Sequence, residues 1–155
     1  MKALKSIISR VKWKSVLGLI SFIALILFVL WAILTLNPFG PGYKGEEDIQ
    51  IRSWVDPGRV DLKGKSTVWI DVMNRGDEKV EVDVDLQTYD KNLIFEKTGN
   101  QRTNESRILG PRESRELDFK VNVNAPDSGK YGIKILVTHT GESIEDEVFL
   151  NVVEK

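Results

Sequence analysis

Hydrophobic residues are spaced in two different ways along this chain. From Val16 to Leu36 the sequence VLGLISFIALILFVLWAILTL is apolar over 21 residues, with Ser21 and Thr35 as its polar members. A bilayer core about 30 Å thick is crossed by roughly 20 helical residues, so this run predicts one transmembrane helix over residues 16–36. Asn37-Pro38 follows it. The residue before a proline is disfavoured in the α region, so the helix should end there.

Beyond residue 48 the hydrophobic residues alternate with polar ones, which is the pattern of half-buried strands. The clearest case is the stretch 80–87, which implies an antiparallel sheet with one face in water. Thr98 to Arg107 is polar and is predicted to be an exposed loop, after which Ile108-Leu109 pairs briefly. A short strand is predicted over Leu93 to Lys97. The alternating hydrophobic positions of the other predicted strands are Ile49 and Ile51; Val68, Ile70 and Val72; Val80, Val82, Val84 and Leu86; Leu117, Phe119, Val121 and Val123; Tyr131, Ile133, Ile135 and Val137; and Ile144, Val148, Leu150 and Val152.

These patterns divide the chain into four parts: a basic tail (1–15), the transmembrane helix (16–36), a Pro/Gly-rich linker (37–47, containing NPFGPGYKG) and a β domain (48–155). Seven or eight short strands separated by turn signals indicate two packed sheets. The predicted fold is therefore an all-β antiparallel sandwich preceded by one N-terminal transmembrane α-helix.

Charge gives the expected orientation. The tail carries five basic residues and no acidic one, whereas the chain from residue 37 onward carries 17 Lys or Arg and all 23 Asp or Glu. The positive-inside rule then places the N-terminus in the cytoplasm and the β domain outside the cell membrane, with Trp13 and Trp31 as anchors at the two membrane interfaces. A cleaved signal peptide is the alternative, but its apolar region is usually about 7–15 residues long. The tail itself is either a topogenic signal or a short interfacial helix.

Several function classes have no support in the composition. An acidic domain with no basic stripe argues against a nucleic-acid partner. The chain has no cysteine, and its one histidine, His139, has no nucleophile motif to serve, so we expect neither an enzyme nor a bound cofactor. Two acidic clusters, Glu81 with Asp83 and Asp85 and Glu145 to Glu147, are interpreted as solvated faces, because no loop that would wrap a calcium ion accompanies them.

The segment Asp127-Ser128-Gly129-Lys130-Tyr131 begins the penultimate predicted strand. It resembles the tyrosine corner of immunoglobulin domains, formed here by Asp127, Gly129 and Tyr131, in which the tyrosine hydroxyl bonds to nearby backbone. The resemblance implies an immunoglobulin-like sandwich, with Ile133 and Ile70 at the positions of the family's two cysteines. The third strand lacks the family's tryptophan, which indicates a distant relative of the antibody fold.

Residues 64–139 resemble the prokaryotic surface modules of the CARDB and NEW3 type, which are found in archaea and bacteria. The resembling stretches are GKSTVWIDVMNRGDEKVEVDVDL, ILGPRESRELDFKVNV and APDSGKYGIKILVTH. The likeness implies an immunoglobulin-like fold and says little of function, because such modules serve as spacers, adhesion units and accessory domains.

Two kinds of surface site follow from the strand pattern. If Val68, Ile70 and Val72 face the core, Trp69 and Met73 face outward, and together with Trp54 they form a candidate interaction surface for a protein partner. Asn104 begins a glycosylation sequon, Asn-Glu-Ser, in the predicted polar loop. The tripeptide Arg75-Gly76-Asp77 is interpreted as a turn.

Three hypotheses follow for the whole chain. The first is a non-enzymatic, membrane-anchored module for adhesion or for contact with the cell wall or S-layer. The second is an accessory subunit of a membrane assembly, such as secretion or archaellum-like machinery. The third is a domain that binds a small ligand or calcium.

Overall fold

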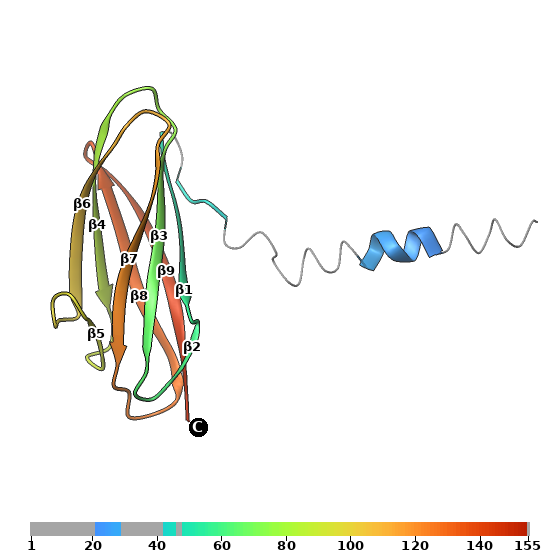
Figure 1. Ribbon diagram of the computed structural model, residues 1–155, viewed down its shortest axis with the longest axis vertical. Helices are drawn as coiled ribbons and strands as arrows, with labels where there is room; N and C mark the ends of the chain where they lie inside the picture. The colour runs from blue at the N-terminus through green and yellow to red at the C-terminus, as the bar shows by residue number, and fades with distance from the viewer. Residues whose placement is uncertain (1–20, 29–41, 46–47, 155) are drawn as a thin grey trace, which may run out of the picture. The chain divides into compact units, whose positions relative to one another are not determined.

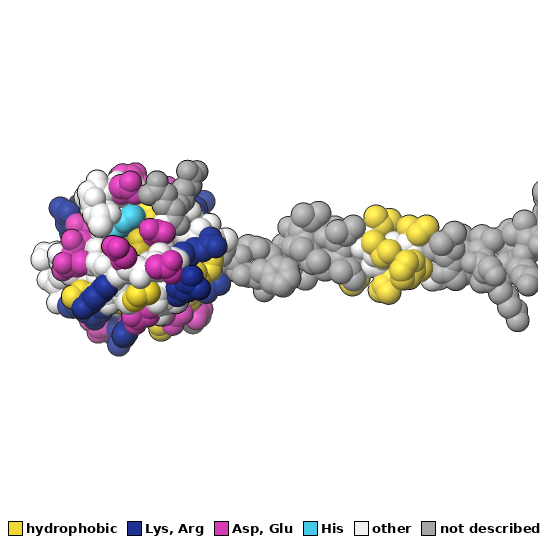
Figure 2. All heavy atoms as spheres, turned by 90° about the horizontal axis from the view of Figure 1, so that it is seen from above, with side chains coloured by type: hydrophobic (Ala, Val, Ile, Leu, Met, Phe, Trp, Pro, Cys, Tyr) yellow, Lys and Arg dark blue, Asp and Glu magenta, His cyan; other side chains and the backbone are white. Residues whose placement is uncertain are grey.

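The computed structural model describes residues 21–28, 42–45 and 48–154. The chain divides into two compact units, Met1–Gly40 and Pro41–Lys155, which are described separately. In the first unit residues 21–28 form an α-helix whose hydrophobic side chains are exposed (Figure 2). Within the described residues no helix has the length and apolarity that crossing a membrane requires. The remainder of the predicted helix 16–36, together with Trp13 and Trp31, lies outside the described residues.

The second unit contains nine strands (Figure 1). They are β1 (Ile49–Asp56), β2 (Arg59–Asp61), β3 (Lys65–Asn74), β4 (Val80–Thr88), β5 (Leu93–Phe95), β6 (Arg102–Leu109), β7 (Ser114–Val123), β8 (Gly129–His139) and β9 (Glu142–Val153).

The strands form two sheets that pack as an immunoglobulin-like sandwich. The four-stranded sheet has the order β1-β3-β7-β5, and the five-stranded sheet has the order β2-β9-β8-β4-β6. The first order corresponds to the A-B-E-D sheet of the immunoglobulin fold. All strand pairs are antiparallel except β2 with β9.

The core lies between the sheets, and the apolar residues of the predicted alternating strands form it. Ile70 and Ile133, which the resemblance to immunoglobulin domains assigns to that family's two cysteine positions, are both fully buried in it. The chain has no cysteine, so apolar packing, and not a disulfide, stabilises the contact between the sheets. All nine described strands contribute to the core. Its other strand residues are Ile49, Ile51, Val60, Val68, Val72, Val82, Val84, Leu86, Leu93, Phe95, Leu109, Leu117, Phe119, Val121, Val123, Ile135, Val137, Val148, Leu150 and Val152.

The prediction of an exposed loop over Thr98 to Arg107 holds for residues 98–101 and was wrong from Arg102 onward. Arg102 onward forms β6, which pairs with β4 along its length from Arg102 opposite Gln87 to Leu109 opposite Val80. An edge strand needs little hydrophobicity, and polar side chains on it discourage pairing with other chains. Only Thr103 and Leu109 of this strand are buried, so the pattern contains no apolar alternation to detect.

β2 is the second difference. It has three residues, of which Val60 alone is buried, and it pairs in parallel with Asn151 to Val153 of β9. A strand this short carries no periodicity, which is why the count of seven or eight became nine.

Candidate interaction surface

The outer face of the four-stranded sheet brings the two tryptophans of the β domain together. Trp54 of β1 lies directly opposite Trp69 of β3, and their rings stack with centroids 6.4 Å apart and an interplanar angle of 13°. On β3 the neighbours Val68 and Ile70 are fully buried, so Trp69 points to the outer face, where it is half-buried. Stacked aromatic pairs of this kind contribute about 0.5–1.5 kcal/mol beyond their area.

Arg52 extends this aromatic pair along β1. Its guanidinium carbon lies 5.2 Å from the centroid of the Trp54 ring and 5.0 Å from that of Tyr43. Cation–π contact at such distances holds the guanidinium against the rings. Its Nε is buried and has no hydrogen-bond partner among the described residues. We call Arg52, Trp54, Trp69 and Met73 the Trp face.

Asp71 lies on the same outer face, between Trp69 and Met73, yet it is only 8% exposed. It accepts hydrogen bonds from the Tyr43 hydroxyl at 2.5 Å, from Arg52 Nη2 at 3.2 Å and from the Ser114 hydroxyl. These three donors compensate the loss of solvent around the carboxylate. The hydrogen bond to Asp71, together with burial, raises the pKa of Tyr43 above 10.0.

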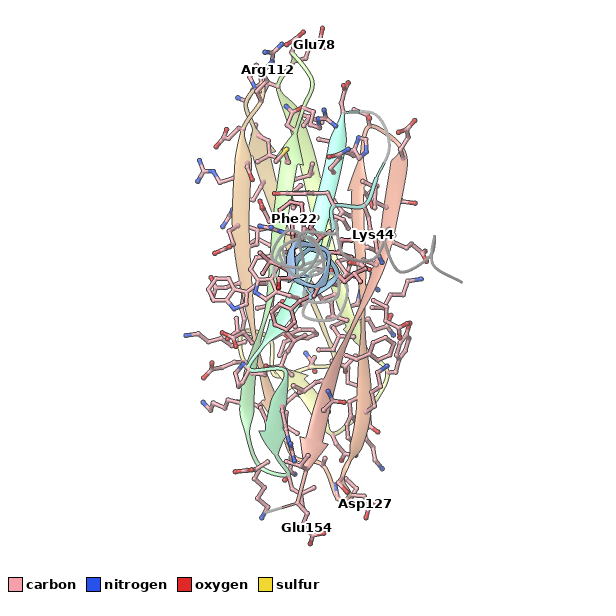
Figure 3. All side chains as sticks on the ribbon, turned by 90° about the vertical axis from the view of Figure 1, so that its right-hand side faces the viewer. Phe22, Lys44, Glu78, Arg112, Asp127 and Glu154 are labelled. Carbon is pink, nitrogen blue, oxygen red and sulfur yellow. The ribbon has the colours of Figure 1, made fainter. Side chains whose placement is uncertain are left out.

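Tyr43 belongs to a short segment, Tyr43 to Gly45, that docks on the edge of β1; we call it the clasp. Lys44 and Ile51 exchange two backbone hydrogen bonds, 2.7 and 2.8 Å long. The Lys44 ammonium also pairs with Asp146 of β9, whose carboxylate accepts a bond from Ser53 as well. Figure 3 shows Lys44 between the two ends of the sandwich, which carry Glu78 and Arg112 at one end and Asp127 and Glu154 at the other.

Gly45 lets the clasp approach this closely. Its φ is +106°, a left-handed conformation that favours glycine. A Cβ at this position would lie 2.5 Å from the carbonyl oxygen of Ile49 and 2.8 Å from Cδ1 of Ile144. The clasp therefore closes the side of the sandwich between β1 and β9, although it falls within the predicted linker 37–47. Residues 37–41, 46 and 47 of that linker lie outside the described residues.

Met73 lies at the other end of the Trp face. It is half-buried and stands opposite Gln50 on β1 and Ser114 on β7. Beside it is a surface hollow of about 420 Å³, which Arg75 and Arg112 also line. The three residues predicted as an interaction surface, Trp54, Trp69 and Met73, thus share one sheet face with Arg52, Tyr43 and Asp71.

On the outer face of the five-stranded sheet some of the charged side chains form ion pairs. Arg102 forms two hydrogen bonds, 2.8 and 2.7 Å long, with the carboxylate of Asp85, and these raise the pKa of Arg102. Lys134 binds Glu145 at 3.0 Å. Among the described residues no group of three or more His, Asp or Glu side chains is arranged to hold a metal ion. Of the two acidic clusters, Asp83 binds Ser106, Asp85 binds Arg102, Glu145 binds Lys134 and Asp146 binds Lys44, whereas Glu81 and Glu147 are exposed.

Other candidate residues lie apart from the Trp face. Asn104 is on β6, in the middle of an edge strand, and its side chain is exposed. His139 is only 7% exposed at the end of β8, with Nδ1 3.2 Å from the Thr140 hydroxyl. Asn74 shapes the Arg75-Gly76-Asp77 turn by donating to the carbonyls of Glu78 and Gly110 and accepting from Gly76 N.

The start of β8 has the geometry of a tyrosine corner. The Tyr131 hydroxyl donates to the carbonyl of Asp127 at 2.9 Å. Gly129 begins β8 between them. The hydroxyl thus ties the turn before β8 to the strand itself, and burial raises the pKa of Tyr131.

Solved structures show what this fold is similar to. A FixG-related protein from Vibrio parahaemolyticus is 15% identical, with a TM-score of 0.49 over 71% of this chain and 99% of that one. The CARDB domain of the PF1109 protein from Pyrococcus furiosus, solved in complex with di-metal ions, is 20% identical, with a TM-score of 0.47 over 72% of this chain and 100% of that one.

The DNA glycosylase AlkC from Pseudomonas fluorescens, solved bound to DNA, is 12% identical with a TM-score of 0.50. The match covers 76% of this chain and 33% of AlkC, so this chain corresponds to about a third of that protein. At such identities the likeness shows the immunoglobulin-like fold alone. No protein-family model and no curated protein matches the sequence.

Proposed function

We propose that this chain is a single-pass membrane protein that presents its immunoglobulin-like domain outside the cell for contact with another protein. The apolar run 16–36 and the five basic residues before it support an anchor with a cytoplasmic N-terminus. The domain is proposed to be non-enzymatic and to act as a contact module of the cell envelope.

The observation that carries the contact role is the Trp face. Large aromatic side chains and arginine are the residues that contribute most to binding energy at protein interfaces. Here two stacked tryptophans lie on one sheet face with an arginine whose buried Nε has no hydrogen-bond partner in the described part of the chain, and Met73 lies beside a hollow lined by Arg75 and Arg112. This combination suits a partner that offers an apolar patch bordered by acidic groups.

Protease digestion tests the topology. Protease added to intact cells or spheroplasts should remove the β domain and leave a lipid-embedded fragment that resists alkaline extraction. A domain shielded from the protease, or released without such a fragment, would contradict the anchor.

A pull-down in mild detergent tests the contact surface. Replacing Trp69→Ala should lower partner recovery at least tenfold, because interface tryptophans commonly contribute 2 kcal/mol or more. The matched control is Tyr89→Ala, which removes a ring that is 60% exposed and lies outside the Trp face. Equal recovery with both variants would remove the Trp face from consideration. Recovery of a stoichiometric polytopic complex would assign the chain to an accessory subunit, whereas recovery of wall or S-layer proteins would assign it to adhesion.

A further inference from the structure

The side of the sandwich opposite the clasp lies between β6 and β7. The chain crosses from one sheet to the other at both ends of this side, through residues 96–101 and 110–113. Between the two crossings, β6 pairs only with β4, and the described residues place no segment over the gap.

Along this side the described residues leave part of the edge of β7 unpaired. β5 pairs with Val121 to Val123 only, and Glu96 N then donates to the carbonyl of Lys120 at 2.9 Å. Figure 1 shows β5 beside one end of β7. From Ser114 to Phe119 the one strand that pairs with β7 in the described part of the chain is β3. Backbone groups alternate in direction along a strand, so those of Glu116 and Asp118 point to the same side as the Lys120 carbonyl, where none of the described strands pairs with them.

A pocket of about 290 Å³ opens beside this edge, where β5 stops. Phe95 and Phe119 form its apolar walls, and Thr103 of β6 lines it from the other sheet. Thr103 is only 3% exposed, and its buried hydroxyl oxygen has no hydrogen-bond partner among the described residues. A buried polar group without a partner is uncommon, so it marks a place where a ligand could supply one.

On the unpaired stretch of β7, from Ser114 to Phe119, the charged side chains of the outer face are acidic, whereas Lys97 and Lys120 line the pocket beside it. Glu116 and Asp118 lie on the outer face of β7, both exposed, and neither forms an ion pair within the described residues. A strand placed beside β7 would bring its outward side chains opposite these two carboxylates. Opposite charges at such positions stabilise strand pairing, and like charges oppose it.

We propose that the free edge of β7 binds an extended segment of a partner protein by strand addition. The segment alternates basic and apolar side chains: the basic ones face Glu116 and Asp118, and an apolar one enters the pocket between Phe95 and Phe119. Its backbone pairs with Glu116 and Asp118, as the clasp pairs with Ile51 on the opposite side of the sandwich. A second copy of this chain pairing through its own β7 would set carboxylates against carboxylates, so the charge favours a different, basic partner.

This inference rests on the proposed contact role but uses a different surface from the Trp face. The test uses the full chain in detergent micelles and a fluorescent peptide of alternating lysine and valine, with a glutamate–valine peptide of equal length as its counterpart. The lysine–valine peptide should bind, and it should slow hydrogen exchange at the Glu116 and Asp118 amides. Absence of binding, equal binding of both peptides, or protection along β6 would each overturn the proposal.

Variants sharpen the test. The double change Glu116→Lys with Asp118→Lys should weaken peptide binding about tenfold, because two favourable cross-strand charge pairs become repulsive. The matched control, Glu81→Lys with Glu147→Lys, makes the same charge change on exposed residues of the other sheet and should leave binding unchanged. Equal loss in both variants would mean attraction by net charge alone, which contradicts strand addition at β7.

A third variant tests the backbone pairing. Glu116→Pro removes the N–H that points away from β3, and proline is tolerated at strand edges. It should abolish peptide binding while thermal melting shows a folded domain. Trp69→Ala should leave peptide binding intact even where it loses the native partner, so failure of the Trp face and failure of the β7 edge are distinguishable.

Discussion

The two lateral sides of the sandwich differ in how the chain treats them. On the side between β1 and β9 the clasp pairs with Ile51, and Tyr43 and Lys44 bind the carboxylates of Asp71 and Asp146. On the side between β6 and β7 the described residues leave the edge of β7 without a neighbour from Ser114 to Phe119. An uncovered strand edge is available for pairing. The comparison shows that the described part of the chain closes one side of the fold with a docked segment and leaves a strand edge open on the other.

The largest effect on stability is expected at Asp71, which holds the side between β1 and β9 together. Asp71→Ala leaves the Tyr43 and Ser114 hydroxyls and Arg52 without their common acceptor. We expect the free energy of unfolding to fall by about 2–3 kcal/mol, as for hydrogen bonds to a charged group. Chemical denaturation measures this. Asp118→Ala, on the same outer face but without an ion pair among the described residues, should change stability by less than about 0.5 kcal/mol. Equal losses would mean that the donors around Asp71 contribute nothing.

Gly45→Ala tests how closely the clasp must approach. The new Cβ meets the Ile49 carbonyl oxygen at 2.5 Å, and the residue has φ +106°. The expected loss of stability is about 1–3 kcal/mol. The control is Gly42→Ala, where nothing lies within 4 Å of the added Cβ. A Gly45→Ala variant as stable as Gly42→Ala would show that the clasp does not hold this position in solution.

The Tyr43 hydroxyl gives the covered side a pH dependence. Its pKa is raised above 10.0 in the folded state by the bond to Asp71 and by burial, so the folded protein keeps this proton where the unfolded chain has lost it. The stabilisation is present below pH 10 and is lost as the pH rises through the folded-state pKa. Tyr43→Phe should lower the free energy of unfolding by about 1 kcal/mol at neutral pH. It should also reduce the loss of stability that the original protein shows as the pH rises above 10. Denaturation midpoints across the alkaline range measure both, and identical alkaline slopes would contradict the assignment.

The smallest effect is expected on the open side. Thr103→Val replaces a hydroxyl that has no hydrogen-bond partner among the residues the structure describes with a methyl group of similar size. Removal of a buried, unsatisfied oxygen should raise stability by about 0.5–1 kcal/mol. Thermal melting measures the change. Thr88→Val is the control: the Thr88 hydroxyl donates to Leu93 O at 2.9 Å, so that variant should be less stable than the original protein. A loss at Thr103 would show that its hydroxyl has a partner in solution.

The alternation of apolar residues was sufficient to predict the sandwich. Strands such as β4 and β7 have one buried and one wet face, so their sequences display the period directly. The same rule failed for β6, because an edge strand with Thr103 and Leu109 as its buried residues has no apolar period. The outward direction expected of Trp69 followed from its buried neighbours Val68 and Ile70.

The rest of the site depends on register, which a single sequence does not reveal. The stacking of Trp54 on Trp69 requires β1 and β3 to align so that these two residues face each other. The burial of Asp71 requires Tyr43, 28 positions earlier in the chain, to return to it. Nothing in the local sequence distinguishes this aspartate from Asp83 or Asp85, which lie on an outer face and bind Ser106 and Arg102.

The clasp also determines how mechanical force enters the domain. A pull on the N-terminal side of residue 43 would act first on the Tyr43 hydroxyl, the Lys44 ion pair and the two backbone bonds to Ile51. Only after these contacts had broken would tension reach the first residue of β1. Such a detachable segment would absorb small extensions and re-form on release, so the sheets would remain intact while the chain before residue 43 is pulled.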